Sequence, residues 1–182
     1  MIDLETLGNK PGFLIFEIGL VAFRGDRIVG VTREVFSYSN SLRKGMRSDP
    51  ETKIWWRDKM GGIPKRYTKD SGNEEISVTL QKITDFIHLL KSSPKEEPLM
   101  WSYSFMDPPM LAAYYEKCNL PQPWKRWHER ELRTALQIMG VNPRISSNEH
   151  TALGDASNQT KILINARKAF YKAGAPQPYQ HA

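Results

Sequence analysis

Hydrophobic residues are distributed along the chain in two patterns, one typical of strands and one of helices. The segment 13–23 is almost continuously apolar and rich in β-forming residues, which predicts a central strand buried on both faces. A turn at Gly25 and Asp26 separates it from a second strand over 27–36. A further short strand is expected over 98–103, and the N-terminal residues before Leu7 predict another.

Apolar residues recur at helical spacing in the later part of the chain. Steps of four, three, four and three residues predict a helix packed on a sheet, with Ile76, Leu80, Ile83, Ile87 and Leu90 on its apolar face. A long final helix is expected from near His150 or Thr151, with one face formed by Ala152, Ala156, Gln159, Leu163, Ala166 and Phe170. Shorter helices are predicted from Pro50, from Asp107 and over 129–139.

This order of elements predicts an α/β fold in which helices flank a mixed β-sheet. With 182 residues, the chain is long enough for one domain, which we expect over 1–173, followed by a flexible tail over 174–182.

A single cysteine, Cys118, excludes an internal disulfide framework and a cysteine-based metal site. No apolar run reaches the ~20 residues of a membrane span and no secretory signal opens the chain, so we expect a cytoplasmic protein without a membrane partner. The net charge of +6 suits an anionic polymer such as nucleic acid, although charge alone leaves this open.

Two carboxylates near the start of the chain are the first candidates for chemistry. Asp3 and Glu5 are two residues apart, so in a strand they point to the same face. Like charges at this spacing repel each other, and a divalent cation with oxygen ligands, such as Mg²⁺, relieves that repulsion. Such pairs also occur by chance, so the remaining ligands must come from elsewhere in the chain.

Three later residues supply the missing groups. Asp107 follows a predicted strand and opens a helix; local sequence favours the simpler interpretation that it is the helix N-cap. His150 precedes Asp155 by five residues, so both face one cleft if His150 lies in the loop before the helix; a capping region with a surface histidine is the alternative. Four carboxylates and a histidine base fit phosphodiester hydrolysis with two divalent ions.

Three motifs resemble those of the DEDD superfamily of 3′–5′ exonucleases: Asp3-Leu-Glu-Thr6, Asp107 after a Trp-containing strand, and His150 separated by four residues from Asp155. The histidine spacing is similar to that of the histidine subtype, the DnaQ-like enzymes with a ribonuclease H-like fold. The segments 52–56, 101–107, 123–127 and 131–134 resemble phage and prophage exodeoxyribonucleases and a related bacterial branch of exoribonucleases.

This resemblance implies roles for the acidic residues and the histidine. Asp3 would bridge two divalent ions, Mg²⁺ with Mn²⁺ as a substitute. Glu5 and Asp155 would complete the first metal site, and Asp107 would serve the second. His150 would take a proton from the attacking water, and the reaction would release 5′-mononucleotides from single-stranded 3′ ends.

Substrate contacts are also implied. Thr6 would contact the sugar of the terminal nucleotide and Leu7 would form a wedge against it. Of the adjacent Trp55 and Trp56, one is expected in the core, and we predict Trp56 to be the exposed one that stacks on a base. Arg133 would pair with either a phosphate or a structural acid. The basic pair Lys65-Arg66 would touch a phosphate or belong to a solvated loop.

Several properties remain open at this stage. The phage-like features favour single-stranded DNA slightly over RNA, and 3′-end trimming of RNA is the alternative. A non-catalytic nucleic-acid-binding module and a phosphohydrolase of small nucleotides are the other functions considered. Because proteins of this kind often dimerise, the resemblance also permits a homodimer, in the cytoplasm of a bacterium or of a phage-infected host.

Overall fold

The computed structural model describes residues 1–64, 67, 74–93, 95–142 and 150–174. Its centre is a five-stranded sheet in the order β3-β2-β1-β4-β5. The strands are β1 (Ile2–Thr6), β2 (Ile15–Arg24), β3 (Arg27–Val35), β4 (Met100–Ser102) and β5 (Glu129–Glu131). The neighbouring pairs among β1, β2 and β3 are antiparallel, whereas β4 runs parallel to β1 and β5 parallel to β4. This mixed sheet confirms the predicted α/β class.

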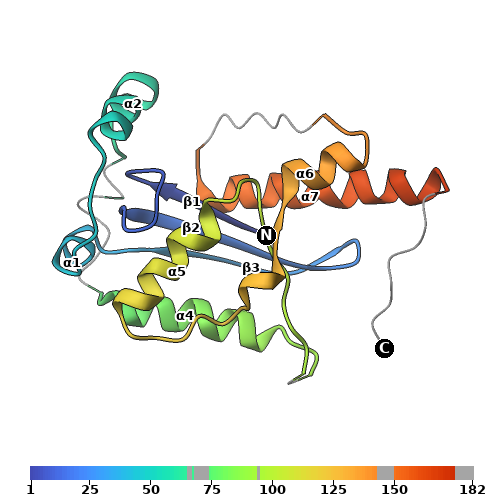
Figure 1. Ribbon diagram of the computed structural model, residues 1–182, viewed down its shortest axis with the longest axis horizontal. Helices are drawn as coiled ribbons and strands as arrows, with labels where there is room; N and C mark the ends of the chain where they lie inside the picture. Colours follow the sequence, from blue (N-terminus) through green and yellow to red (C-terminus); the bar gives the residue numbers. More distant parts are fainter. Residues whose placement is uncertain (65–66, 68–73, 94, 143–149, 175–182) are drawn as a thin grey trace.

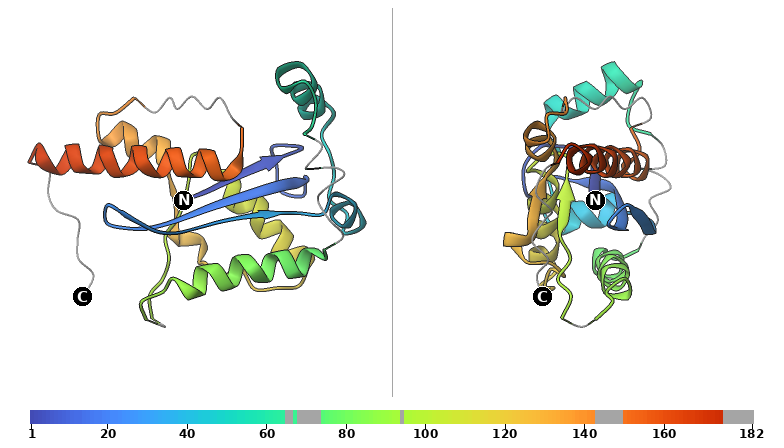
Figure 2. Two further views of the ribbon diagram at one scale, coloured as in Figure 1. Left: turned by 180° about the vertical axis from the view of Figure 1, so that it is seen from behind. Right: turned by 90° about the vertical axis from the view of Figure 1, so that its right-hand side faces the viewer.

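Helices cover both faces of the sheet (Figures 1 and 2). The helices are α1 (Tyr38–Arg43), α2 (Pro50–Met60), α4 (Ile76–Leu89), α5 (Asp107–Lys117), α6 (Leu132–Ile138) and α7 (Ala152–Lys172), with a 3-10 turn over Arg126–His128. Helices α4 and α5 lie on one face, whereas α6 and α7 lie on the other. Within the described ranges, no helix has the length and apolar character needed to cross a membrane.

Two apolar clusters fill the spaces between these layers. On the α4 and α5 side, Ile2 and Leu4 of β1 pack in a large core with residues of both helices. On the α7 side, Leu132, Leu136 and Leu163 belong to a smaller cluster. Because side chains alternate along a strand, burying Ile2 and Leu4 on one face turns Asp3 and Glu5 to the opposite face, toward α7.

The structure departs from the sequence predictions at two elements. The helix expected over 129–139 is wrong at its start, because Glu129–Glu131 form β5 and pair with β4 at the edge of the sheet. Helix α6 begins only at Leu132, where the carboxylate of Glu131 accepts a hydrogen bond from the Thr134 backbone N–H. The short helix α1 was not predicted. Most of the expected tail, residues 175–182, lies outside the described residues.

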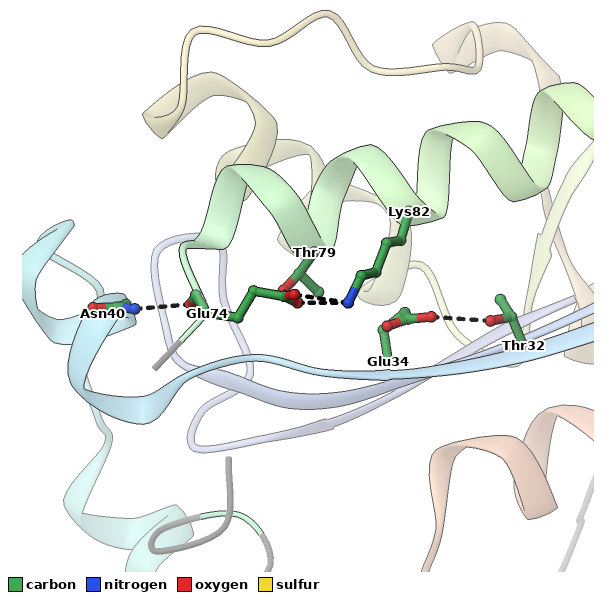
Figure 3. A network of polar contacts seen from close by, with 6 residues as sticks. All are labelled: Thr32, Glu34, Asn40, Glu74, Thr79 and Lys82. Carbon is green, nitrogen blue, oxygen red and sulfur yellow. Dashed lines mark hydrogen bonds and ion pairs between the residues drawn. The ribbon is translucent and has the colours of Figure 1, made fainter. Parts of the chain in front are cut away.

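A polar network joins α1 to the start of α4, beside β3 and on the side of the sheet away from α7 (Figure 3). The Asn40 amide donates to the backbone carbonyl of Glu74 at 2.8 Å. The carboxylate of Glu74 accepts from the Thr79 hydroxyl at 3.1 Å and forms an ion pair with Lys82 at 2.8 Å. This network contains an ordinary paired carboxylate with which the acids facing α7 can be compared.

Candidate active site

Strand β1 carries the first two acids of the site on the face that α7 covers. Asp3 lies opposite Gly19 of β2, and Glu5 lies opposite Glu17. The strand register shifts directly after Glu5, and there the Trp56 indole N–H donates to the Thr6 carbonyl at 3.0 Å. Helix α2 therefore supports the end of the strand that presents both acids.

Gly19 permits the close approach of α7 to this strand pair. A Cβ atom at this position would lie 2.3 Å from backbone atoms of Ala152 and Leu153, which is far inside van der Waals contact. Only glycine therefore allows the first turn of α7 to rest on the sheet, and this turn carries Asp155 over the acids of β1. The sequence reasoning did not single out Gly19; a glycine inside an otherwise apolar strand was the available signal.

His150 lies in the loop just before α7, two residues ahead of its first residue. One ligand atom from each of Glu5, His150 and Asp155 lies within 4.8 Å of the other two. The backbone of His150 is in the left-handed region, with φ of 39°, which is uncommon for a residue other than glycine. Its ring also meets that of Trp55 edge to face, with 5.5 Å between the ring centroids.

Asp107 is the first residue of α5, which follows β4. The N-cap position belongs to Met106, and no side chain caps the helix there, so the prediction that Asp107 is the N-cap is wrong. The Asp107 carboxylate instead acts electrostatically on Asp3. The structure thus brings together acids from β1, α5 and α7, with His150 beside them.

The electrostatics of this cluster disfavour its fully ionised form. Burial raises the pKa of Asp107 to about 7. Burial and then the charge of Asp107 raise the pKa of Asp3 well above its usual range, and the charges of Glu5 and Asp155 act in the same direction. Among the described residues, no Lys or Arg forms an ion pair with Asp3, Asp107 or Asp155.

A divalent cation fits this set of donors. Carboxylate oxygens are the ligands that Mg²⁺ prefers, and an imidazole nitrogen lies within the same 4.8 Å cluster. A cation there would offset the repulsion that raises the pKa of Asp3. The chemistry of the donors therefore indicates a metal site, without deciding which metal it takes.

The two tryptophans of α2 have the opposite exposure from the one expected. Trp56 is 2% exposed, whereas Trp55 is 40% exposed, so the prediction that Trp56 is the exposed residue is wrong. Trp56 packs edge-on against Phe16 and Tyr67, and its indole N–H is used by the Thr6 carbonyl. Trp55 is the one beside His150.

The remaining predicted substrate contacts are in several different environments. Leu7 is completely buried in the core, so the expected wedge position is wrong. The Thr6 hydroxyl is partly buried and donates to the Gly8 carbonyl at 2.7 Å. Arg133 forms an ion pair with Glu131 at 2.7 Å and lies over the Tyr103 ring. Of the two predicted partners, a phosphate or a structural acid, Arg133 therefore pairs with the structural acid. Lys65 and Arg66 lie outside the described residues.

Comparison with known proteins gives the family. None of the curated proteins matches the chain. The family model described as the 3′–5′ exoribonuclease Rv2179c-like domain matches residues 1–166, which include all five residues of the carboxylate and histidine cluster. The chain therefore belongs to the Rv2179c-like family of 3′–5′ exoribonucleases and is an exonuclease of the hydrolase class.

Proposed function

We propose that this protein is a metal-dependent exonuclease of the histidine subtype that trims single-stranded RNA from the 3′ end and releases 5′-mononucleotides. The observation that carries the proposal is the convergence of Glu5, His150 and Asp155 within 4.8 Å, together with Asp3, whose pKa is raised by burial and by the charge of Asp107. Such a cluster combines several oxygen ligands with a group able to accept a proton near neutral pH.

The four carboxylates would hold two divalent ions, Mg²⁺ by preference with Mn²⁺ as a substitute. Asp3 would be shared between the ions, Glu5 and Asp155 would complete one site, and Asp107 would serve the other. When bound, the ions neutralise the carboxylates, favour ionisation of the attacking water and stabilise charge on the phosphate. In the metal-free protein, the raised pKa values of Asp3 and Asp107 favour protonated acids, so metal binding would release protons.

His150 would act as the general base. Water attacks the phosphorus atom of the last phosphodiester, and its proton passes to the imidazole. The bond between phosphorus and the 3′-oxygen of the preceding nucleotide breaks, and that oxygen gains a proton to become the new 3′-hydroxyl. The Trp55 ring lies edge to face with the His150 ring and would restrict rotation of the imidazole away from Glu5 and Asp155.

Trp55, rather than Trp56, would stack on a base of the substrate. Trp55 is 40% exposed and its ring lies beside that of His150, whereas Trp56 is enclosed in the core. Stacking of a base on an aromatic side chain contributes about 1–3 kcal/mol and tolerates any sequence. Trp55 would then both contact the substrate and restrain the base catalyst.

Matched RNA and DNA strands labelled at the 5′ end would test this function. We expect a stepwise ladder on RNA with Mg²⁺, 5′-mononucleotides as the products, and loss of the ladder in Asp155→Asn. The family description favours RNA, whereas the phage-like motifs favour DNA, so a faster ladder on DNA would overturn the RNA preference alone. No ladder on either polymer would contradict the exonuclease proposal. Cleavage confined to very short oligonucleotides would instead support the small-substrate phosphohydrolase.

A further inference from the structure

Helix α7 buries two polar side chains, Gln159 and Thr160, and Gln159 is the one that carries an amide. The residues of the buried face at 152, 156, 163 and 166 are alanine or leucine, whereas Gln159 is only 4% exposed and carries an amide. Burying an amide costs free energy unless its donors and acceptor are used. The apolar pattern of the neighbouring positions predicts an apolar residue at position 159 of this buried face.

The amide of Gln159 is directed at a proposed metal ligand. Its Nε2 donates to Oδ1 of Asp3 at 2.7 Å, across 156 residues of sequence. Gln159 lies one turn after Asp155, so the two side chains share a face of α7. The same helix therefore supplies one acid of the site and supports another acid that comes from β1.

The carbonyl oxygen of the Gln159 amide, in contrast, is left unpaired among the described residues. Within the described ranges, the buried Oε1 of Gln159 has no hydrogen-bond partner. While Asp3 is ionised, as a metal ligand must be, the amide cannot turn over to improve this, because Oε1 would then face a carboxylate oxygen. A buried acceptor without a partner is destabilising, so the contact with Asp3 is retained at some loss of stability. That combination is typical of a functional residue rather than a packing residue.

We infer that Gln159 is a positioning residue that orients the Asp3 carboxylate for divalent-cation binding, an inference that rests on the metal-dependent function proposed above. With Oδ1 held by the amide, rotation of the carboxylate is restricted and its remaining lone pairs stay directed into the site. The hydrogen bond also favours the ionised form of Asp3, opposing the effects of burial and of Asp107.

The test compares Gln159→Met with the parent protein and with Thr160→Val. Methionine keeps the length and helix propensity of glutamine but removes the amide. Thr160 is the adjacent buried polar residue, and its hydroxyl donates only to the Ala156 carbonyl of its own helix. Three properties would be measured for each protein: the metal-free melting temperature, the Mn²⁺ dissociation constant by calorimetry, and kcat and KM on single-stranded RNA.

For Gln159→Met, we expect a melting temperature no lower than that of the parent and a Mn²⁺ affinity weaker by roughly 10–100-fold. Its kcat at fixed low Mg²⁺ should fall, its KM for RNA should stay within about twofold, and added Mg²⁺ should recover much of the loss. Thr160→Val should retain the parental Mn²⁺ affinity and kcat.

Unchanged Mn²⁺ affinity in a folded Gln159→Met protein would overturn the inference, as would a parent that binds no Mn²⁺. Because Mn²⁺ binding is measured without RNA, this result is independent of the exonuclease assay. A different outcome would contradict the proposed function alone. In that case the parent protein binds Mn²⁺ and Gln159→Met weakens the binding, but the parent cleaves neither RNA nor DNA.

Discussion

Glu74 and Asp3, on opposite sides of the sheet, have opposite electrostatic environments. On the α4 side, the hydrogen-bonded Lys82 holds the pKa of Glu74 below its usual range, and Thr79 contributes a further hydrogen bond (Figure 3). On the α7 side, the pKa of Asp3 is raised by burial and by the charge of Asp107, and the uncharged amide of Gln159 donates a hydrogen bond to its carboxylate. The charge of the Glu74 carboxylate is therefore balanced within the protein by Lys82. The Asp3 carboxylate would instead be stabilised by a cation bound from solution.

The difference separates the parts of the molecule that maintain the fold from those that serve chemistry. An exposed ion pair such as Glu74 with Lys82 contributes little free energy and needs no partner from outside. A cluster of buried and partly buried acids reduces stability until a cation binds to it. Neutralising one acid on each side should therefore have opposite effects on stability and activity.

The largest effect is expected from Asp3→Asn. Because Asp3 is the acid proposed to be shared by both ions, RNA hydrolysis should fall by about 10³-fold or more. Removal of its charge should also relieve repulsion with Asp107, so the metal-free melting temperature should stay the same or rise. Gel-based cleavage assays and thermal scans of the EDTA-treated protein would measure the two quantities.

Glu74→Gln is the matched control for Asp3→Asn. It should lower the melting temperature only slightly, by roughly 1–2 °C, and leave RNA hydrolysis at the parental rate. If Asp3→Asn destabilised the metal-free protein more than Glu74→Gln does, the contrast between the two sides of the sheet would be wrong.

His150→Ala should produce the next largest loss. Loss of a general base typically costs 10²–10⁴-fold, so we expect kcat to fall by roughly 10²-fold with Mn²⁺ affinity close to the parental value. Single-turnover cleavage and calorimetry would measure them in the same preparation. A parental rate near pH 7 would exclude His150 as the base, and strongly weakened Mn²⁺ binding would make it a metal ligand instead.

Gly19→Ala should affect both stability and activity to an intermediate degree. The new methyl group would meet backbone atoms of α7, which cannot move aside as a flexible side chain can, so we expect a loss of about 1–3 kcal/mol in the free energy of unfolding. Displacement of the first turn should also weaken Mn²⁺ binding through Asp155. Gly30→Ala is the control, since its Cβ would meet side-chain atoms of Leu90 at 3.1 Å and Phe86 at 3.4 Å. Equal losses in both variants would contradict the specific role of Gly19.

The metal-free stability should also depend on pH. Because folding raises the pKa of Asp107 to about 7 and also raises that of Asp3, these two acids bind more protons in the folded state than in the unfolded state above about pH 4. The Met1 amine, whose pKa burial lowers to about 5, acts in the opposite direction, so the parent is compared with Asp3→Asn, which shares this amine. Relative to Asp3→Asn, the melting temperature of the parent should fall as pH rises from 5 to 8, by roughly 2–4 °C. Mg²⁺ should restore it mainly at the higher pH, because the ligands must be ionised. A parent melting temperature that rose with pH relative to Asp3→Asn in EDTA would contradict the raised pKa of Asp3.

The fold class and the positions of several site residues could be predicted from the sequence, because they depend on local patterns. Strand alternation puts Asp3 and Glu5 on one face, and the stripe of Ile76, Leu80, Ile83 and Ile87 does form the buried face of α4. The α/β class followed from the order of such segments.

The rest depends on tertiary packing that local patterns do not contain. Helical phase requires Trp55 and Trp56 to point in different directions, but the choice between them is made by Phe16, Tyr67 and the Thr6 carbonyl. Residues 129–131 form a strand only because β4 provides an edge to pair with. Similarly, Leu7 is enclosed by a core whose members come from distant segments.

Anomalous diffraction from crystals containing Mn²⁺ would test the central claim most directly. We expect two Mn²⁺ peaks that share Asp3, one also contacting Glu5 and Asp155 and the other on the side of Asp107. Removal of the metal with EDTA should abolish RNA hydrolysis. The absence of any peak at Asp3, together with undiminished RNA hydrolysis in EDTA, would contradict this claim.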